Sequence, residues 1–485
     1  MIGSAHNNDQ SAKPDALLIA IAGYVCEYNI DSTKAYKTAK YCLMDAIACA
    51  LMASSYSACT RLLGPSVPSA TFAAGARIPT TNYCLEPVQA AFNIGCMIRW
   101  LDFNDTWLAE EWGHPSDNLG SILAVSDYLS RQHLLQGKPA IQLNDVLSAM
   151  IKAYEIQGIL ALENSLNQVG LDQVLLVKIA STAVVSHLLG ARHQQIINAV
   201  SNAFMDGGTL RAYRHSPMTG TRKSWAAGDA CRRAVQLALM AMQNDMGYPT
   251  VLTAKEWGFY DVLFKGNEFS LKQVFASYVI ENILFKVKYP AEFHAQTAVE
   301  AAVKLHILLK DKLEQIKYIQ IETQQSAMRV INKTGKLHNP ADRDHCLQYM
   351  VAVALLTGQL SADNYEDDYS KDTRIDALRA KIQVNENLQF SQDYLDPAKR
   401  SIANSIQIFF QDKSFTEKLV IEFPLGHPRR RDEALPALKK KFEQAINTHL
   451  SSNKAAKIMR IFECDRVFIE TSVNQLMDLL AKEME

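Results

Sequence analysis

Two short polar segments carry the side chains of this chain that are best suited to acid–base chemistry. Asp102 and Thr106 lie in the first segment, and His114 and Asp117 lie in the second. Both follow an apolar stretch over residues 91–98, which predicts a helix that ends in a polar loop at the edge of a core. Carboxylates, a hydroxyl and an imidazole at such a place could remove and return protons.

A structural role is the alternative for each of these residues taken alone. Asp and Ser often cap helices, so Ser116 or Asp117 could begin the helix that we expect over residues 119–129. The two segments also contain Trp107 and Trp112. Several titratable groups with large aromatic neighbours favour a site over a set of caps.

A second cluster places four cations and an imidazole in a loop just before a helix that we expect over residues 224–242. Helix starts attract anions, so cations there are locally unfavourable unless a phosphate or polycarboxylate binds to them. A surface loop paired with nearby acids is the alternative. The cluster consists of Arg211, Arg214, His215, Arg222 and Lys223.

Two more polar segments lie farther along the chain. Lys286, Lys288 and His294 fall where we expect two domains to meet, which is a favoured position for small-molecule pockets. Arg429 and Arg430 follow a predicted strand, and forked arginine side chains are suited to binding a polyacid.

Composition narrows the class of function. Of 485 residues, 48% are hydrophobic and 21% are charged, and the net charge is −1. This balance predicts no nucleic-acid partner, and no apolar run is long enough to predict a membrane span. Nine cysteines without a Cys-x-x-Cys pair favour a reducing compartment, by default the cytoplasm. Because metal-ligand spacings and nucleotide-binding loops are also missing from the sequence, we expect chemistry by side chains alone, without a metal or cofactor.

Helical periodicity dominates the chain up to about residue 280 and again from about residue 434. The apolar run over residues 174–185 could be a strand by itself, but its length favours a buried helix. Between the helical regions, short alternating runs predict strands over 316–321, 406–410 and 419–423, and longer periodic runs predict helices over 292–309 and 344–357.

The predicted fold is therefore mainly α, with a large all-helical domain and a smaller α+β domain inserted before its last helices. The expected boundaries are 1–280 for the first part of the helical domain, 281–430 for the α+β domain, and 431–485 for the helices that complete the first domain.

The longest polar motifs resemble those of the MmgE/PrpD family, and in detail its branch that dehydrates 2-methylcitrate. The likeness extends over nearly the whole chain, down to residues 426–428. The motifs that carry it are Trp100–Trp107, Trp112–Asn118, Tyr213–His215, Arg222–Asp229 and Tyr289–His294.

This resemblance implies a homodimer in which the smaller domain acts as a lid, and a tricarboxylate substrate. The implied reaction is metal-independent dehydration of 2-methylcitrate to 2-methyl-cis-aconitate in the methylcitrate cycle of propionate catabolism, with citrate or cis-aconitate as further substrates to test. The family's site residues match Asp102, Thr106, His114, Lys223 and a second lysine, either Lys286 or Lys288. We prefer Lys286 because it keeps the dehydratase spacing to Pro290.

The chemistry needs a base for a proton α to a carboxylate, an acid for the departing hydroxyl, and cations for the developing charge. His114 or Asp102 could be the base, alone or as a pair, and a lysine or His215 could be the acid. We expect Arg214, His215, Lys288, His294, Arg429 and Arg430 to bind the carboxylates of the substrate.

Three alternatives remain at this stage: a decarboxylase of the same fold, an epimerase of the same fold, and an inactive binding protein. The resemblance weakens the first, because the histidine of the decarboxylases would fall near residues 171–173, where this chain has none.

Overall fold

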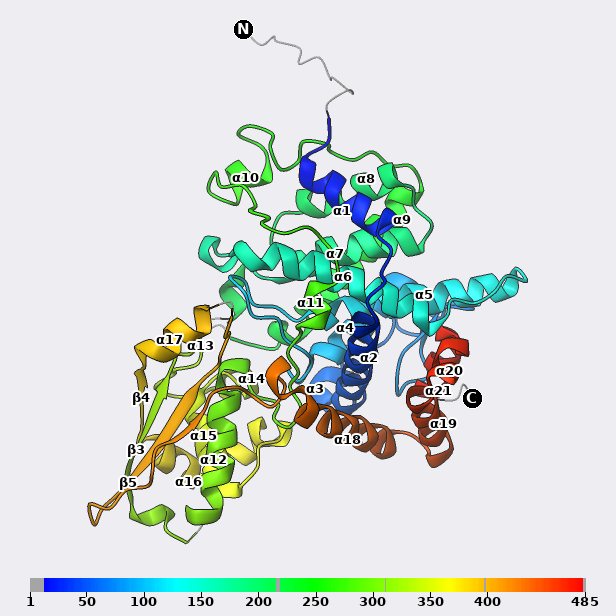
Figure 1. Cartoon of the computed structure of the whole chain (residues 1–485). Helices are drawn as coiled ribbons and strands as arrows, with labels where there is room; N and C mark the ends of the chain where they lie inside the picture. Colours follow the sequence, from blue (N-terminus) through cyan, green and yellow to red (C-terminus); the bar gives the residue numbers. More distant parts are fainter. Residues whose placement is uncertain (1–12, 215–218, 310, 397, 483–485) are drawn as a thin grey trace.

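The computed structural model describes residues 13–214, 219–309, 311–396 and 398–482. Helices dominate these residues and gather around two separate hydrophobic cores, which lie side by side in Figure 1. The expectation of a mainly α fold is confirmed. Within the described residues, no helix has both the length and the apolar character needed to cross a membrane.

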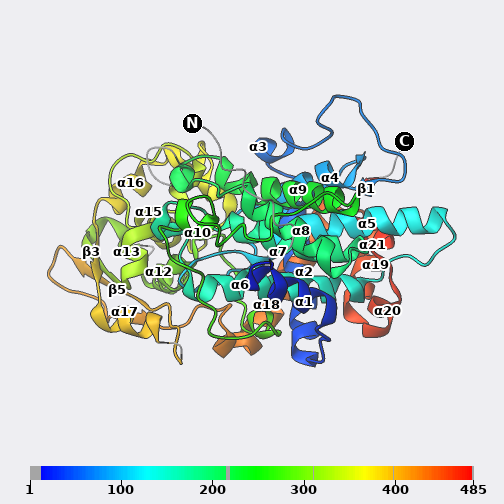
Figure 2. The same cartoon turned by 90° about the horizontal axis from the view of Figure 1, so that it is seen from above.

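The larger core consists of helices alone, apart from a two-residue antiparallel ladder formed by β1 and β2. Helix α7 covers the run that could have been a strand, and nearly all of its residues are buried, which confirms the prediction of a buried helix. Viewed from above, α2, α6 and α7 lie in the middle of this part, and α5 extends outward from it (Figure 2). The elements are α1 (Ala16–Glu27), α2 (Thr33–Ala53), α3 (Ser57–Thr60), β1 (Ala76–Arg77), β2 (Cys84–Leu85), α4 (Pro87–Arg99), α5 (Leu119–Leu135), α6 (Leu143–Glu163), α7 (Val174–Leu188), α8 (His193–Met205), α9 (Arg222–Met242), α10 (Phe259–Val262) and α11 (Tyr278–Glu281).

The smaller core lies between a four-stranded sheet and helices that pack against it, chiefly α12 and α15. The strand order is β4-β3-β5-β6, with β4 parallel to β3 and the other pairs antiparallel. We did not expect β4, because this edge strand buries only Ile382 and so shows no alternating pattern. The elements are α12 (Gln296–Leu309), β3 (Ile316–Thr323), α13 (Gln325–Val330), α14 (Pro340–Arg343), α15 (Leu347–Thr357), α16 (Thr373–Arg379), β4 (Ile382–Glu386), α17 (Leu388–Leu395), β5 (Asn404–Phe410) and β6 (Leu419–Ile421).

The C-terminal helices return to the larger core. Leu438, Phe442 and Ile446 of α18 are buried in it, as are Ile458 of α19 and Leu476 of α21. The smaller core is therefore made by a continuous stretch of chain that interrupts the larger one. These last helices are α18 (Arg431–His449), α19 (Ser452–Glu463), α20 (Asp465–Glu470) and α21 (Val473–Leu480).

Three glycines allow α4, α5 and α9 to pack backbone to backbone. A Cβ atom on Gly95 would lie 2.8 Å from the Cα atom of Gly228, and one on Gly120 would lie 2.8 Å from the Cα atom of Gly95. A Cβ atom on Gly228 would lie 2.6 Å from the carbonyl oxygen of Phe92. The polar segments of the candidate site adjoin the ends of these three helices, so this close packing also brings the segments together.

Candidate active site

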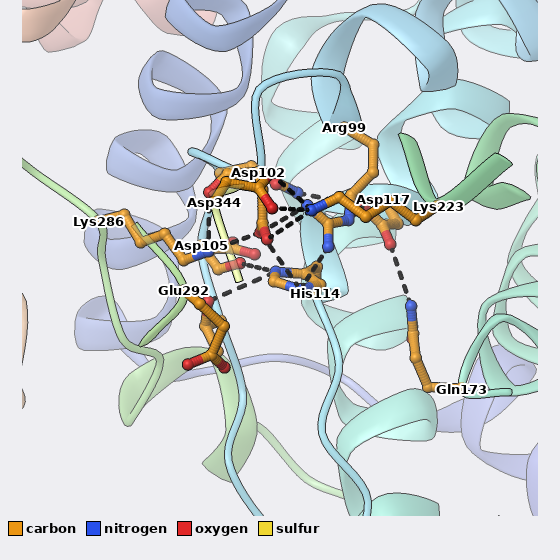
Figure 3. A network of polar contacts seen from close by, with 12 residues as sticks. Arg99, Asp102, Asp105, His114, Asp117, Gln173, Lys223, Lys286, Glu292 and Asp344 are labelled. Carbon is orange, nitrogen blue, oxygen red and sulfur yellow. Dashed lines mark hydrogen bonds and ion pairs between the residues drawn. The ribbon is translucent and has the colours of Figure 1, made fainter. Parts of the chain in front are cut away.

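A cavity of about 130 Å³ lies where the helical part meets the α+β part. Its wall combines cations, acids and imidazoles with a few apolar groups, and Figure 3 shows the polar network around it. The lining residues are Arg99, Asp102, Thr106, Leu108, Trp112, His114, Asn167, Gln173, Arg211, Arg214, Lys286, Glu292, Phe293, Arg329, Val330 and His345.

Asp102 lies at the centre of this network. Its Oδ1 atom accepts hydrogen bonds from Arg99 and from Lys286, each at 2.6 Å. Burial alone would raise the pKa of Asp102, but these cations hold it well below its usual range, so the carboxylate stays ionised. The backbone of Asp102 has a φ of 49°, a left-handed conformation that Asp tolerates better than most residues and that is often found at functional sites.

Lys286 reaches Asp102 because the chain around it pairs with the polar loop. Thr106 and Leu284 exchange backbone hydrogen bonds of 2.8 and 3.1 Å. Two residues farther on, the Lys286 ammonium also donates to the backbone oxygen of Asp102 at 2.7 Å. Gly426 supports this segment from the other side, where a Cβ atom would lie 1.7 Å from the carbonyl oxygen of Phe285.

The hydrogen bonds of His114 define its tautomer. Nδ1 lies 2.7 Å from the carbonyl oxygen of Asp105, so it must carry a proton and donate it. Nε2 lies 2.9 Å from the guanidinium of Arg99, which can only donate, so Nε2 must carry a lone pair. Burial first, and Arg99 second, lower the pKa of His114 well below that of a free imidazole. The structure thus holds His114 as a neutral base.

The carboxylates of Asp105 and Asp117 accept hydrogen bonds from residues that hold the polar loop in place. Asp105 accepts hydrogen bonds from the Ser116 hydroxyl at 2.7 Å and from the Tyr154 hydroxyl at 2.6 Å. Asp117 accepts one from Asn104 at 3.1 Å. Burial raises the pKa of Asp105 to about 7 and that of Asp117 to about 6. Ser116 and Asp117 therefore brace the loop instead of capping α5.

Lys223 joins the helical part to the α+β part. It is the second residue of α9 and donates to both carboxylate oxygens of Asp344 at 2.6 Å, and it lies 3.9 Å from Oδ2 of Asp102. The next residue, His345, has Nδ1 at 2.7 Å from Asp344 and Nε2 at 3.9 Å from Asp102. Burial lowers the pKa of Lys223 even though Asp344 opposes the shift.

A second group of cations forms the wall beside α7. Arg214 makes a bidentate ion pair with Asp172, and Arg211 lies 3.5 Å from the same carboxylate and 3.6 Å from Glu111. Gln173 occupies the part of the wall where the decarboxylases are expected to have a histidine. Arg211 and Arg214 of the basic loop therefore line the cavity while each pairs with Asp172, whereas Arg222 pairs with Asp229.

Several residues that the sequence suggested do not line this cavity. Lys288 is exposed, whereas Lys286 is buried. His294 is fully buried and contacts Glu292 and Tyr394. Arg429 and Arg430 make contacts outside this cavity. Arg429 donates to the carbonyl of Ala398, and Arg430 pairs with Glu300 and Glu433. His215 lies outside the described residues.

Four residues at or beside the cavity were not predicted as site residues from the sequence: Arg99, Arg329, Asp344 and His345. Arg99 lies at the end of α4 and was hidden in an apolar helix, and Arg329 lies on α13 without a motif. Asp344 and His345 follow Arg343 in a short charged run that belongs to none of the motifs. Nothing local distinguishes such residues from ordinary surface charges.

One group among the described residues has the donor types for a metal ion. The ligand atoms of Asp102, Asp344 and His345 all lie within 4.8 Å of one another. Ammonium groups already contact these carboxylates at 2.6 Å, Lys286 on Asp102 and Lys223 on Asp344. A divalent cation would have to displace or approach these charges, so the donor set fits lysine better than a metal.

A cavity with several cations, an ionised carboxylate and a neutral imidazole suits acid–base chemistry on a polyanionic substrate. The chain belongs to the MmgE/PrpD family: residues 19–272 match the MmgE/PrpD N-terminal domain and residues 289–466 match the MmgE/PrpD C-terminal domain.

Its relatives match along nearly their whole length. A protein of Cupriavidus necator named 2-methylcitrate dehydratase is 54% identical over 476 residues, which cover 97% of this chain and 98% of the relative. One of Escherichia coli (strain K12) with the same name is 53% identical over 480 residues, which cover 98% and 99%. A protein of Yarrowia lipolytica named 2-methylcitrate dehydratase, mitochondrial, is 50% identical, with 97% and 92% covered.

Proposed function

We propose that this chain is a lyase that dehydrates 2-methylcitrate to 2-methyl-cis-aconitate in the methylcitrate cycle of propionate catabolism. The observation that carries the proposal is the neutral imidazole of His114 among cations in one cavity, in a chain whose relatives along nearly its whole length bear that name. A substrate with three carboxylates matches the positive charge of this wall.

The cations bind the substrate and stabilise the charge that forms when its proton leaves. Arg99, Arg211, Arg214 and Arg329 line the cavity, and the Nε atoms of Arg99 and Arg211 are buried without a hydrogen-bond partner. Loss of the proton α to a carboxylate puts a second negative charge on that group, and preorganised cations favour this state over the ground state.

His114 is the base in this proposal, and Asp102 is not. Asp102 is held ionised by Arg99 and Lys286, which makes its carboxylate a poor proton acceptor. His114 carries a lone pair on Nε2, and Arg99 donates to it. When a substrate carboxylate takes that N–H group, the lone pair becomes free to remove the proton. Thr106, whose hydroxyl lies 3.4 Å from Nδ1 of His114, helps to hold the ring.

The same residues support a reaction without a metal ion. The ammonium groups of Lys223 and Lys286 already neutralise the carboxylates of Asp344 and Asp102. They occupy the positions that a metal ion bound to these carboxylates would take. The α+β part, residues 281–430, then acts as a lid. It brings His345 and Arg329 over the substrate. A homodimer and a cytoplasmic location remain predictions for this chain.

The test is to mix the purified protein with 2-methylcitrate in the presence of EDTA and follow the ultraviolet absorbance of the conjugated product. We expect absorbance to rise, and to rise faster than with citrate. No rise with either acid would contradict the proposal, and release of carbon dioxide would indicate a decarboxylase instead. A rise that EDTA abolishes and added metal restores would contradict the metal-free mechanism alone.

A further inference from the structure

We propose that His345, oriented by Asp344, is the general acid that protonates the departing hydroxyl, so that the α+β part supplies the acid and the helical part supplies the base. This inference rests on the proposed dehydration. It concerns a pair of residues that the sequence motifs did not include.

Two imidazoles face Asp102 from opposite parts of the protein. Nε2 of His114 lies 3.8 Å from Oδ1 of Asp102, and Nε2 of His345 lies 3.9 Å from Oδ2. Both rings line the same cavity. A substrate in that cavity can therefore contact one imidazole from the helical part and another from the α+β part, as an elimination with separate base and acid requires.

The partners of the two rings differ, and this difference assigns the roles. His114 has a guanidinium against Nε2, which opposes a proton there. Nδ1 of His345 lies 2.7 Å from the Asp344 carboxylate, which favours a protonated ring, and 3.0 Å from the Lys223 ammonium, which opposes one. His345 has the carboxylate of Asp344 at hydrogen-bond distance, whereas Asp102 lies 3.8 Å from His114, and this difference favours His345 as the acid.

Lys223 positions this acid. Its ammonium binds both oxygens of Asp344 and lies 3.0 Å from Nδ1 of His345. Because Lys223 binds Asp344 in this way, it holds the carboxylate and the imidazole in place. The same ion pair leaves Lys223 less free to donate a proton to the substrate. The contact also crosses between the two parts of the protein, so the acid is in place only when they are together.

The step balances in atoms and electrons. His114 takes the proton from the carbon next to a carboxylate, and the electron pair of that C–H bond forms the new carbon–carbon double bond. The C–O bond of the tertiary alcohol breaks, and its oxygen leaves as water with the proton from Nε2 of His345. One proton then moves from His114 to His345 to restore the starting state.

The charges around His345 predict how the rate responds to pH. The ring faces Asp344 and Glu292 from the α+β part, Lys223 from α9 and Asp102 from the polar loop. Burial and Lys223 lower its pKa in the free protein, whereas a bound polyanion adds negative charge and favours the protonated ring. We expect kcat to fall at high pH as His345 loses its proton.

The experiment compares two leaving groups in His345→Gln. With 2-methylcitrate, kcat should fall about 10²- to 10⁴-fold. With the analogue in which fluorine replaces the tertiary hydroxyl, fluoride leaves with its electron pair and needs no proton, so its release should change less than about tenfold. His114→Gln should lose both reactions, because each needs the base.

The control is His338→Gln, an exposed histidine of the same part, which should keep both rates. His345→Asn provides a second variant if His345→Gln does not fold. An unchanged dehydration rate in a folded His345 variant refutes the assignment, and so does an equal loss of both reactions, which would indicate a structural role. Wild-type protein without dehydratase activity would instead refute the proposed function.

Discussion

Replacing Lys441 with Met should lower both the stability and the activity of this protein. Lys441 of α18 is buried, and its ammonium donates to Asp45 of α2 at 2.7 Å. It also donates to the backbone oxygens of Phe103 at 2.8 Å and Lys286 at 3.1 Å. One ammonium thus neutralises a buried acid and ties together the two segments that carry Asp102 and Lys286.

The magnitude follows from what Lys441→Met leaves behind. Asp45 would remain as a buried carboxylate with no cation, and two backbone oxygens would lose their common donor, a change that costs about 3–5 kcal/mol. Unfolding a chain of 485 residues releases about 1 kcal/mol of entropy per kelvin, so Tm should fall by about 3–5 °C.

The loss of stability should grow as pH rises. Burial already raises the pKa of Asp45, although Lys441 opposes the shift. Without Lys441 the folded pKa rises further above the unfolded one, so the folded state binds the extra proton and gains stability at low pH. The loss should therefore be smaller near about pH 5 than near about pH 8.

The double variant Asp45→Asn with Lys441→Met separates the two roles of the lysine. It removes both charges, so we expect it to recover a large part of the lost stability. The oxygens of Phe103 and Lys286 stay without their donor, so kcat should remain at least about tenfold low. Thermal melting and product absorbance measure the two effects. A double variant that regains full kcat would refute the positioning argument, and an unchanged Tm in Lys441→Met would refute the buried pair.

Three further predictions concern the site and the packing that forms it. Lys286→Met should lower kcat about 10²-fold or more while Asp102 stays ionised through Arg99, and steady-state kinetics will show whether kcat or KM changes. Because the pKa of His114 is held low, kcat/KM should start to fall on the acid side only below about pH 6.5. The folded protein should also lose stability below that pH, because the unfolded imidazole takes up a proton. A pH series in which kcat/KM already falls above about pH 6.5 would contradict a neutral His114. Gly228→Ala should lower stability by about 1–3 kcal/mol or more, since its Cβ would meet a backbone oxygen of α4, and denaturant unfolding will measure the loss.

Much of the fold could be predicted from the sequence because its determinants are local. The length of its apolar run predicted α7 as a buried helix, and alternating residues predicted β3, β5 and β6. The polar loop after α4 was predicted in the same way, since a helix must end where its apolar face ends. The edge strand β4 escaped because a strand with few buried residues has no such pattern.

The sequence by itself determined that the longer apolar segments are helical, which loop carries the acid–base residues, and which family motifs they form. Only the tertiary structure decided which residues far apart in the chain share the cavity. Lys288 and Lys286 have the same chemistry, but tertiary packing buries Lys286 against Asp102 and leaves Lys288 exposed. Asp344 and His345 reach Asp102 only because two separately packed cores meet there. The physical reason is that periodicity records which side of an element is buried, whereas a contact between distant segments depends on how whole elements pack.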